Sequence, residues 1–128
     1  MDGLHPHFTS GLRWHTRLDA ALDEACGAGK KVFVQHGRQT CTGSRALVER
    51  TLAKEEVAEV WTRHFVGLAS DADHAEPAVA ALIEALPRHE PTPVLIYLSA
   101  DGAVLASTAG GRPAAVLLND MLGAISKR

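Results

Sequence analysis

Apolar residues in this chain fall into two kinds of pattern, short continuous runs and stripes with helical spacing. Three runs, at residues 31–36, 65–69 and 94–98, have the length and the β-branched or aromatic content of buried strands. Asp101-Gly102 is a strong turn signal after the third run, so residues 103–107 are predicted to return as the second arm of a hairpin. The sequence therefore predicts about four strands.

The stripes predict helices between and around these strands. Apolar residues recur at i, i+3, i+4 and i+7 before the first strand, after each of the first two runs and at the end of the chain. The predicted helices cover residues 16–26, 41–53, a short segment with Val57, Val60, Trp61 and His64 on one face, 77–86 and a last segment that buries Leu117, Leu118, Met121, Leu122 and Ile125.

The order of these elements predicts an α/β fold. Two strands joined through a helix are expected to be parallel, whereas the final hairpin is antiparallel. The result is a mixed central sheet of about four strands with helices on both faces. Residues 16–128 are expected to form this single domain, and residues 1–15, rich in Gly, Pro and His, an irregular arm.

Composition and charge make several classes of partner and site unexpected. The formal net charge is -2 over 128 residues, which gives no electrostatic reason to expect a nucleic acid or membrane partner. The opening residues lack the basic and apolar regions of a signal peptide, so the cytoplasm is the expected location. Two cysteines do not make a disulfide framework. The seven histidines are scattered without metal-ligand spacing, so no metal site is expected.

Cys41 carries the main chemical signal. It stands in Thr40-Cys41-Thr42-Gly43-Ser44-Arg45, between a predicted strand and a predicted helix. The first turn of a helix favours a thiolate, so Cys41 is the candidate nucleophile. Ser44, three residues on, either donates its hydroxyl to that thiolate or caps the helix. A hydroxyl cannot attack a mixed disulfide, so the site reads as a C-x-x-C motif that has lost its second thiol.

The chain at this point resembles a thioredoxin-like domain. Residues 37–47, Gly37 to Leu47, are similar to the motif G-x-x-W-C-x-x-C-K/R-x-L with the tryptophan and second cysteine replaced, and Pro91-Thr92-Pro93 precedes the strand at Val94. Residues 20–31 look more like the DsbD-tail and AGR-type branches than like thioredoxin. The resemblance implies a thioredoxin-like fold with a cis Thr92–Pro93 bond facing Cys41. It also implies a substrate-binding surface formed by Thr40, Thr42, Gly43, Thr92 and Pro93.

The departures from the family bear on activity. Gln35 stands where thioredoxins have a buried aspartate that relays protons to the second cysteine, and Gly67 stands where they have the lysine partner of that aspartate. The chain therefore lacks both the proton relay and the second cysteine of the motif, whose thiol the relay serves. Ordinary dithiol reductase activity is therefore not expected.

Three functions stay open. The first is monothiol exchange, a thiol–disulfide oxidoreductase activity in which Cys41 forms mixed disulfides with protein or with glutathione as a co-substrate, without a resident cofactor. The second is a non-catalytic peptide-binding or chaperone-like module that uses the groove around Cys41 and Pro93. The third, an iron–sulfur cluster shared between subunits, is disfavoured because residues 41–44 are not the C-G-F-S of monothiol glutaredoxins.

Two other residues are candidates for a role near the thiol. Cys26 lies on the first apolar stripe and is expected to be buried in the core. A strand of about 20 Å separates it from Cys41, so no internal disulfide is expected. His36, at the end of the first strand, is expected to be a packed residue; the alternative is a base or cation beside Cys41.

Overall fold

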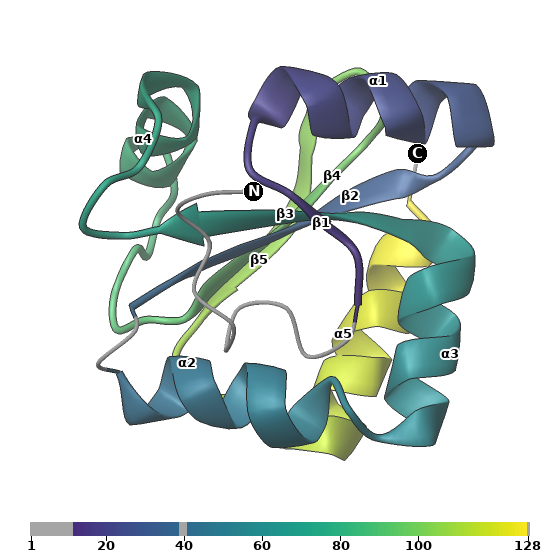
Figure 1. Cartoon of the computed structure of the whole chain (residues 1–128), viewed down its shortest axis with the longest axis vertical. Helices are drawn as coiled ribbons and strands as arrows, with labels where there is room; N and C mark the ends of the chain where they lie inside the picture. Colours follow the sequence, from purple (N-terminus) through teal and green to yellow (C-terminus); the bar gives the residue numbers. More distant parts are fainter. Residues whose placement is uncertain (1–11, 39–40, 128) are drawn as a thin grey trace.

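The computed structural model describes residues 12–38 and 41–127, which form a five-stranded sheet between two layers of helices (Figure 1). The strand order is β1-β3-β2-β4-β5. The bounds are β1 Trp14–His15, β2 Lys31–Gly37, β3 Phe65–Asp71, β4 Val94–Leu98 and β5 Val104–Ala109. β2 pairs in parallel with β3 and antiparallel with β4, and β4 pairs antiparallel with β5. The predicted mixed α/β sheet is confirmed.

Helices cover both faces of this sheet. Figure 1 shows α1 and α4 on one side and α2, α3 and α5 on the other. The bounds are α1 Leu18–Ala28, α2 Thr42–Ala46, the π-helix η2 Leu47–Thr51, α3 Glu55–His64, α4 Pro77–Glu84 and α5 Ala114–Ile125. None of the helices in the described part of the chain is long and apolar enough to cross a lipid bilayer.

β2 separates two hydrophobic cores, because successive side chains of a strand point to opposite faces. Val32 and Val34 belong to the core under α1 and α4. Phe33 belongs to the second core, in which its ring contacts Tyr97 at a centroid distance of 5.4 Å and Phe65 at 6.0 Å. Gln35 and Gly37 share the face of Phe33. The end of β2 therefore presents these two residues to the helix that begins after Cys41.

The prediction of about four strands is wrong by one. Trp14 and His15, assigned to the irregular arm, form β1 and pair in parallel with Gly67 and Leu68 of β3. A two-residue strand has no periodicity that a sequence could reveal. Trp14 stabilises it through packing, since its ring lies 5.0 Å from that of Trp61. The rest of the predicted arm, residues 1–11, lies outside the described residues.

The helix predicted for residues 41–53 is present in two parts. An α-helical turn over Thr42–Ala46 passes into the π-helix Leu47–Thr51, which ends before Lys54 caps α3. Leu47, Val48 and Leu52 are buried, so the segment still turns its apolar side to the sheet.

The prediction that Cys26 is buried is wrong. Cys26 is exposed, whereas Ala21 and Ala25 are the residues of α1 that are fully buried. At 100° per residue, Cys26 lies 100° around the helix from Ala25 and at the edge of the apolar stripe. An assignment based on spacing alone does not resolve the edge of this stripe from its centre.

We predict that Gly67→Ala destabilises the fold. A Cβ on Gly67 would lie 2.5 Å from Cζ2 of Trp61 and 2.6 Å from Cε3 of Trp14, so at least one indole ring must move. Overpacking of this kind costs about 2–3 kcal/mol of unfolding free energy. Denaturant unfolding measures this loss. Gly123→Ala is the matched control: Gly123 is helical, a Cβ added there would meet nothing within 4 Å, and the variant should become slightly more stable. Equal stability of the two variants would contradict the packing argument.

Candidate functional site

Cys41 lies where β2 ends and α2 begins. It is the N-cap residue of α2, with extended backbone angles of φ -85° and ψ 121°. Its N–H donates to the carbonyl of Arg38 at 3.1 Å, and its carbonyl accepts from the N–H of Arg45 at 3.0 Å. A turn after the strand thus holds the backbone on one side and the first helical hydrogen bond holds it on the other. The thiol is partly exposed and faces the loop before β4.

The surroundings of Cys41 favour its thiolate. Partial burial of the thiol opposes ionisation, but hydrogen bonds from the Ser44 hydroxyl, from Thr92 and from the N–H groups of Ser44 and Gly43 outweigh it and lower the pKa of Cys41 to about 7. When protonated, Sγ donates to the Thr92 carbonyl over 3.4 Å. About half of the Cys41 side chains therefore carry the nucleophilic thiolate at neutral pH.

Ser44 occupies the position of the second cysteine in a C-x-x-C motif. It is fully buried on the first turn of α2, and its Oγ accepts a hydrogen bond from the N–H of Arg38 at 3.2 Å. Its hydroxyl also lies within reach of the Cys41 sulfur. Ser44 therefore ties the start of the helix to the end of β2 and supports the thiolate at the same time. Of the two roles that the sequence left open, the bond to the thiolate is supported and helix capping is wrong, because Cys41 is the N-cap of α2 and no side chain among the described residues caps this helix.

Gly43, Thr92 and Pro93 meet at Cys41. A Cβ on Gly43 would lie 3.3 Å from Pro93 Cδ, 3.5 Å from the Thr92 carbonyl oxygen and 3.8 Å from Cys41 Sγ, so glycine allows the helix to approach this loop closely. The Thr92–Pro93 peptide bond is cis, as is Glu90–Pro91. The Pro93 carbonyl accepts from the N–H of Gly110 at 3.0 Å, which fixes the loop to the end of β5.

Of the two remaining residues of the predicted substrate-binding surface, the structure describes only one. Thr42 is exposed on the first turn of α2, next to Cys41. Thr40 lies outside the described residues, so its expected contribution stays a prediction.

His36 is a packed residue and faces away from Cys41. It lies on the opposite face of β2 from Gln35 and is buried, and its Nδ1 lies 2.9 Å from Ser70 Oγ. Burial lowers the pKa of His36, and the positive charge of Arg38 lowers it further, against a smaller opposing effect of Asp71. His36 is thus neutral at physiological pH and does not serve as a cation beside the thiol.

The residues that replace the proton relay of thioredoxins are both buried in the second core. Gln35 is fully buried, and neither atom of its carboxamide has a hydrogen-bond partner among the described residues. Gly67 provides the space for the indole rings of Trp14 and Trp61. No side chain at these two positions can accept a proton, so neither takes part in proton transfer at Cys41.

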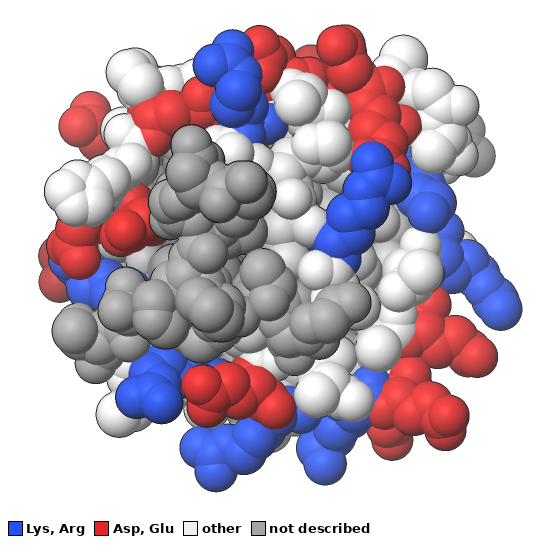
Figure 2. All heavy atoms as spheres, viewed as in Figure 1, with Lys and Arg blue, Asp and Glu red and all other residues white. Residues whose placement is uncertain are grey.

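The charges around Cys41 are paired. Arg38 forms an ion pair with Asp73, and Arg45 forms one with Glu49 at 3.6 Å. Among the described residues, Figure 2 shows both signs on one face of the molecule, where Lys and Arg lie interspersed with Asp and Glu around its rim. An anionic or cationic partner would therefore gain little from long-range attraction.

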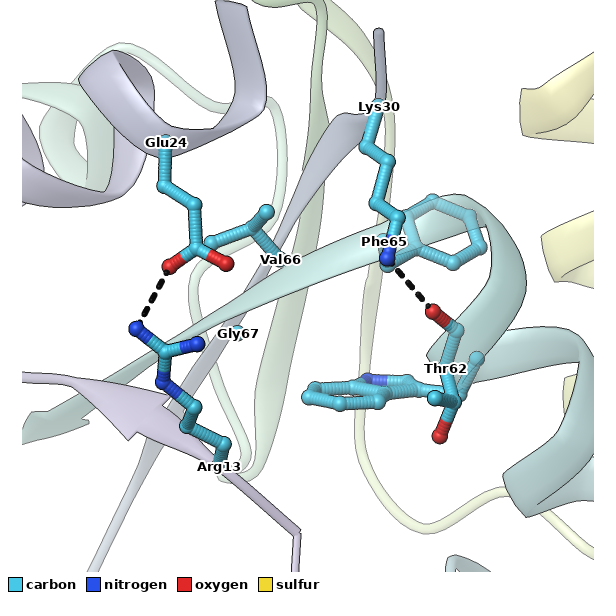
Figure 3. A pocket seen from close by; sticks show the side chains of 8 residues that line it. Arg13, Glu24, Lys30, Thr62, Phe65, Val66 and Gly67 are labelled. Atoms are coloured by element: carbon cyan, nitrogen blue, oxygen red, sulfur yellow. Dashed lines mark hydrogen bonds and ion pairs between the residues drawn. The ribbon is translucent and has the colours of Figure 1, made fainter. Parts of the chain in front are cut away.

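A small cavity lies at the opposite end of β2 and β3 from Cys41 (Figure 3). Its volume is about 140 Å³, and its charged residues already have partners. Arg13 pairs with Glu24 at 3.3 Å, and Lys30 donates to the Thr62 carbonyl at 2.9 Å. His15 also binds Glu24, at 2.5 Å. Sequence reasoning missed this cavity because its residues come from separate elements and follow no motif.

The described part of the chain contains no group of three or more His, Cys, Asp or Glu side chains that could hold a metal ion. The candidate site is therefore the arrangement of Cys41, Gly43, Ser44, Thr92 and Pro93. It supplies one acidic thiol at the start of a helix, opposite a cis-proline loop. An α/β fold with such a site defines a protein of the thioredoxin-fold class.

Comparison with known proteins identifies the family. Residues 13–100 match the family model described as thioredoxin-like, so the chain belongs to the thioredoxin-like family. A search of curated protein sequences finds no match.

Solved structures agree with this assignment. A thioredoxin from Thermus thermophilus is 25% identical with a TM-score of 0.74, over 91% of this chain and 88% of that one. A disulphide isomerase from Xylella fastidiosa is 20% identical with a TM-score of 0.61, over 84% and 82%. The C-terminal domain of DsbD from Neisseria meningitidis is 21% identical with a TM-score of 0.62, over 82% and 91%. Thiol–disulfide exchange is the general chemistry that these relationships support.

Proposed function

We propose that the protein is a monothiol thiol–disulfide exchange protein that acts through Cys41. The observation that carries this proposal is the pairing of an acidic thiol at Cys41, with a pKa of about 7, with a buried hydroxyl at Ser44. The first residue supplies a nucleophile at neutral pH. The Ser44 hydroxyl cannot displace a substrate that is bound to Cys41 as a mixed disulfide.

The exchange has two steps. The Cys41 thiolate attacks one sulfur of a substrate disulfide; the bond from Cys41 Sγ to that sulfur forms, the substrate disulfide breaks, and the other substrate sulfur leaves as a thiolate that takes a proton from solvent. An external thiolate then attacks the mixed disulfide at the substrate sulfur. The new disulfide is released together with the Cys41 thiolate, and no net oxidant or reductant is consumed.

The loop before β4 positions the substrate in this proposal. The Thr92 carbonyl lies 3.4 Å from Cys41 Sγ, and Gly43 packs against the buried Pro93, so Thr42 and Thr92 are the more exposed residues beside the thiol. An extended segment of a partner protein, or glutathione, can lie along Thr42, Gly43 and Thr92 with its sulfur at Cys41, supported from below by the buried Pro93, and Thr40 would complete this surface. Paired charges nearby suit an uncharged segment of the partner.

Glutathione suits the second step as co-substrate, since the protein has no second thiol near Cys41. The other cysteine, Cys26, lies in the last turn of α1, before β2, whereas Cys41 follows β2. We therefore propose a reducing compartment, the cytoplasm, as the place of action. No resident cofactor is required.

We predict that the alkylation of Cys41 follows a single ionisation. Because the pKa of Cys41 is lowered to about 7, the rate with iodoacetamide should rise with pH, reach half of its maximum near pH 7 and become constant at higher pH. The experiment uses Cys26→Ser, since Cys26 is exposed and would also react. A midpoint near the ordinary cysteine value of about 8.5 would contradict an activated thiol.

A peptide-binding module without catalysis is the second candidate. The exposed Thr42 and the partly exposed Thr92 beside Cys41 favour it, since they could contact an extended chain whether or not the thiol reacts. The two functions separate in Cys41→Ser, which keeps the surface and loses the nucleophile.

A further inference from the structure

The carboxamide of Gln35 has no partner in a part of the core where a polar group is costly. Gln35 has no exposed surface, and neither its Nε2 nor its Oε1 has a hydrogen-bond partner among the described residues. A buried amide without hydrogen bonds destabilises the fold, and an apolar side chain of similar size would avoid that cost. Packing alone therefore does not explain a glutamine here.

The position of Gln35 brings its amide close to Ser44. Both residues border the bare Cα of Gly37: a Cβ there would lie 3.0 Å from Gln35 Nε2 and 2.7 Å from Ser44 Oγ. Nε2 and Oγ thus lie on the same side of Gly37, under the first turn of α2. A methyl group at residue 37 would collide with both.

Ser44 Oγ has one lone pair that can still accept a hydrogen bond from the Gln35 amide. A hydroxyl can donate one hydrogen bond and accept two. Ser44 Oγ accepts from the N–H of Arg38 at 3.2 Å and donates toward the Cys41 sulfur. A second lone pair remains, and Gln35 Nε2 is an unused donor beside it.

We infer that Gln35 is a positioning residue: a rotation of its side chain beside Gly37 brings the carboxamide, unpaired among the described residues, to donate to Ser44 Oγ, and this bond directs the Ser44 hydroxyl toward the Cys41 thiolate. This inference rests on the proposed function, because it concerns the same thiolate. A hydrogen bond received by the hydroxyl oxygen strengthens the bond that the hydroxyl donates. A carboxamide stays neutral at all relevant pH values, so Gln35 supports the thiolate without adding an ionisation of its own.

The test removes the amide and measures the Cys41 pKa from the pH dependence of alkylation in the Cys26→Ser background. Gln35→Met keeps the length of the side chain and removes its hydrogen bonds. We expect the pKa of Cys41 to rise by about half a unit to one unit. In a Ser44→Ala background the same substitution should have no effect, because the hydroxyl through which Gln35 acts is gone. Gln35→Leu repeats the test if Gln35→Met does not fold.

Tyr97→Phe is the matched control. The Tyr97 hydroxyl is also buried without a partner among the described residues and on the same face of the sheet, but it lies toward the other end of β4 from Pro93. Its removal should leave the Cys41 pKa unchanged. An unchanged pKa in Gln35→Met, or an equal rise with and without Ser44, overturns the positioning role.

These results are distinguishable from a failure of the proposed function. If the unmodified protein already has an ordinary thiol pKa, the monothiol proposal fails and the inference fails with it. If the pKa is near 7 and Gln35→Met does not change it, only the role of Gln35 is lost.

Discussion

Cys41→Ser is expected to abolish mixed-disulfide formation. The serine hydroxyl is a poor nucleophile at neutral pH, whereas Cys41 has a thiol pKa of about 7 and is partly exposed. The reaction with glutathione disulfide, followed by intact-protein mass spectrometry, should fall to background. Unfolding free energy should change little, because the side chains are similar in size and the hydrogen bond to Thr92 can be kept.

Cys26→Ser is the control for this experiment. Cys26 is exposed on α1, away from the cis-proline loop, so its loss should leave the exchange rate at Cys41 unchanged. Adducts that persist on Cys26 in the Cys41→Ser variant, with the wild-type rate of exchange, would place the activity elsewhere. Full retention of cellular function in Cys41→Ser would favour the peptide-binding module.

Ser44→Cys is expected to produce a dithiol reductase from a protein that is a poor one. A thiol at residue 44 is held next to the mixed disulfide and can attack it within the same molecule, so insulin reduction with thioredoxin reductase as electron donor should rise by about tenfold or more. Single-turnover release of a labelled substrate from Cys41 measures the same gain directly.

The gain should be incomplete, since Gln35 cannot accept the proton of the new thiol. Gln35→Glu in addition to Ser44→Cys replaces the amide with a carboxylate of the same shape and should raise the rate further. Ser44→Ala, which removes the hydroxyl without adding a thiol, is the control and should not increase turnover. Insulin reduction by the unmodified protein at the rate of Ser44→Cys would show that a second internal thiol is not needed.

Strands and helices with strong patterns could be predicted, and those fixed by a few tertiary contacts could not. The run at Val94–Leu98 matched its strand because five consecutive apolar residues leave few alternatives. β1 could not be predicted, because it depends on Trp14 packing against Trp61, far along the chain. The exposure of Cys26 depends on which part of α1 faces the sheet, and spacing alone does not fix that within one residue.

The site could be predicted further than composition or charge would allow, because its residues follow a known motif. Cys41, Ser44, Thr92 and Pro93 came from two segments about 50 residues apart that only the resemblance connected. The contact of Gln35 with the site could not be obtained that way, although the contacts of Ser44 and Thr92 with Cys41 could. The approach of Gln35 and Ser44 at Gly37 depends on the path of the chain from β2 into α2, and no local pattern encodes it.

The placement of the two tryptophans determines how this protein can be observed. Trp14 and Trp61 are the only tryptophans of the sequence, and they pack together over Gly67, at the end of the sheet opposite to Cys41. Many thioredoxins have an indole directly before the reactive cysteine, where Thr40 stands here. Intrinsic fluorescence of this chain should therefore follow unfolding and remain insensitive to the oxidation state of Cys41. Fluorescence then reports stability alone, and alkylation of Cys41 in the same sample reports its redox state.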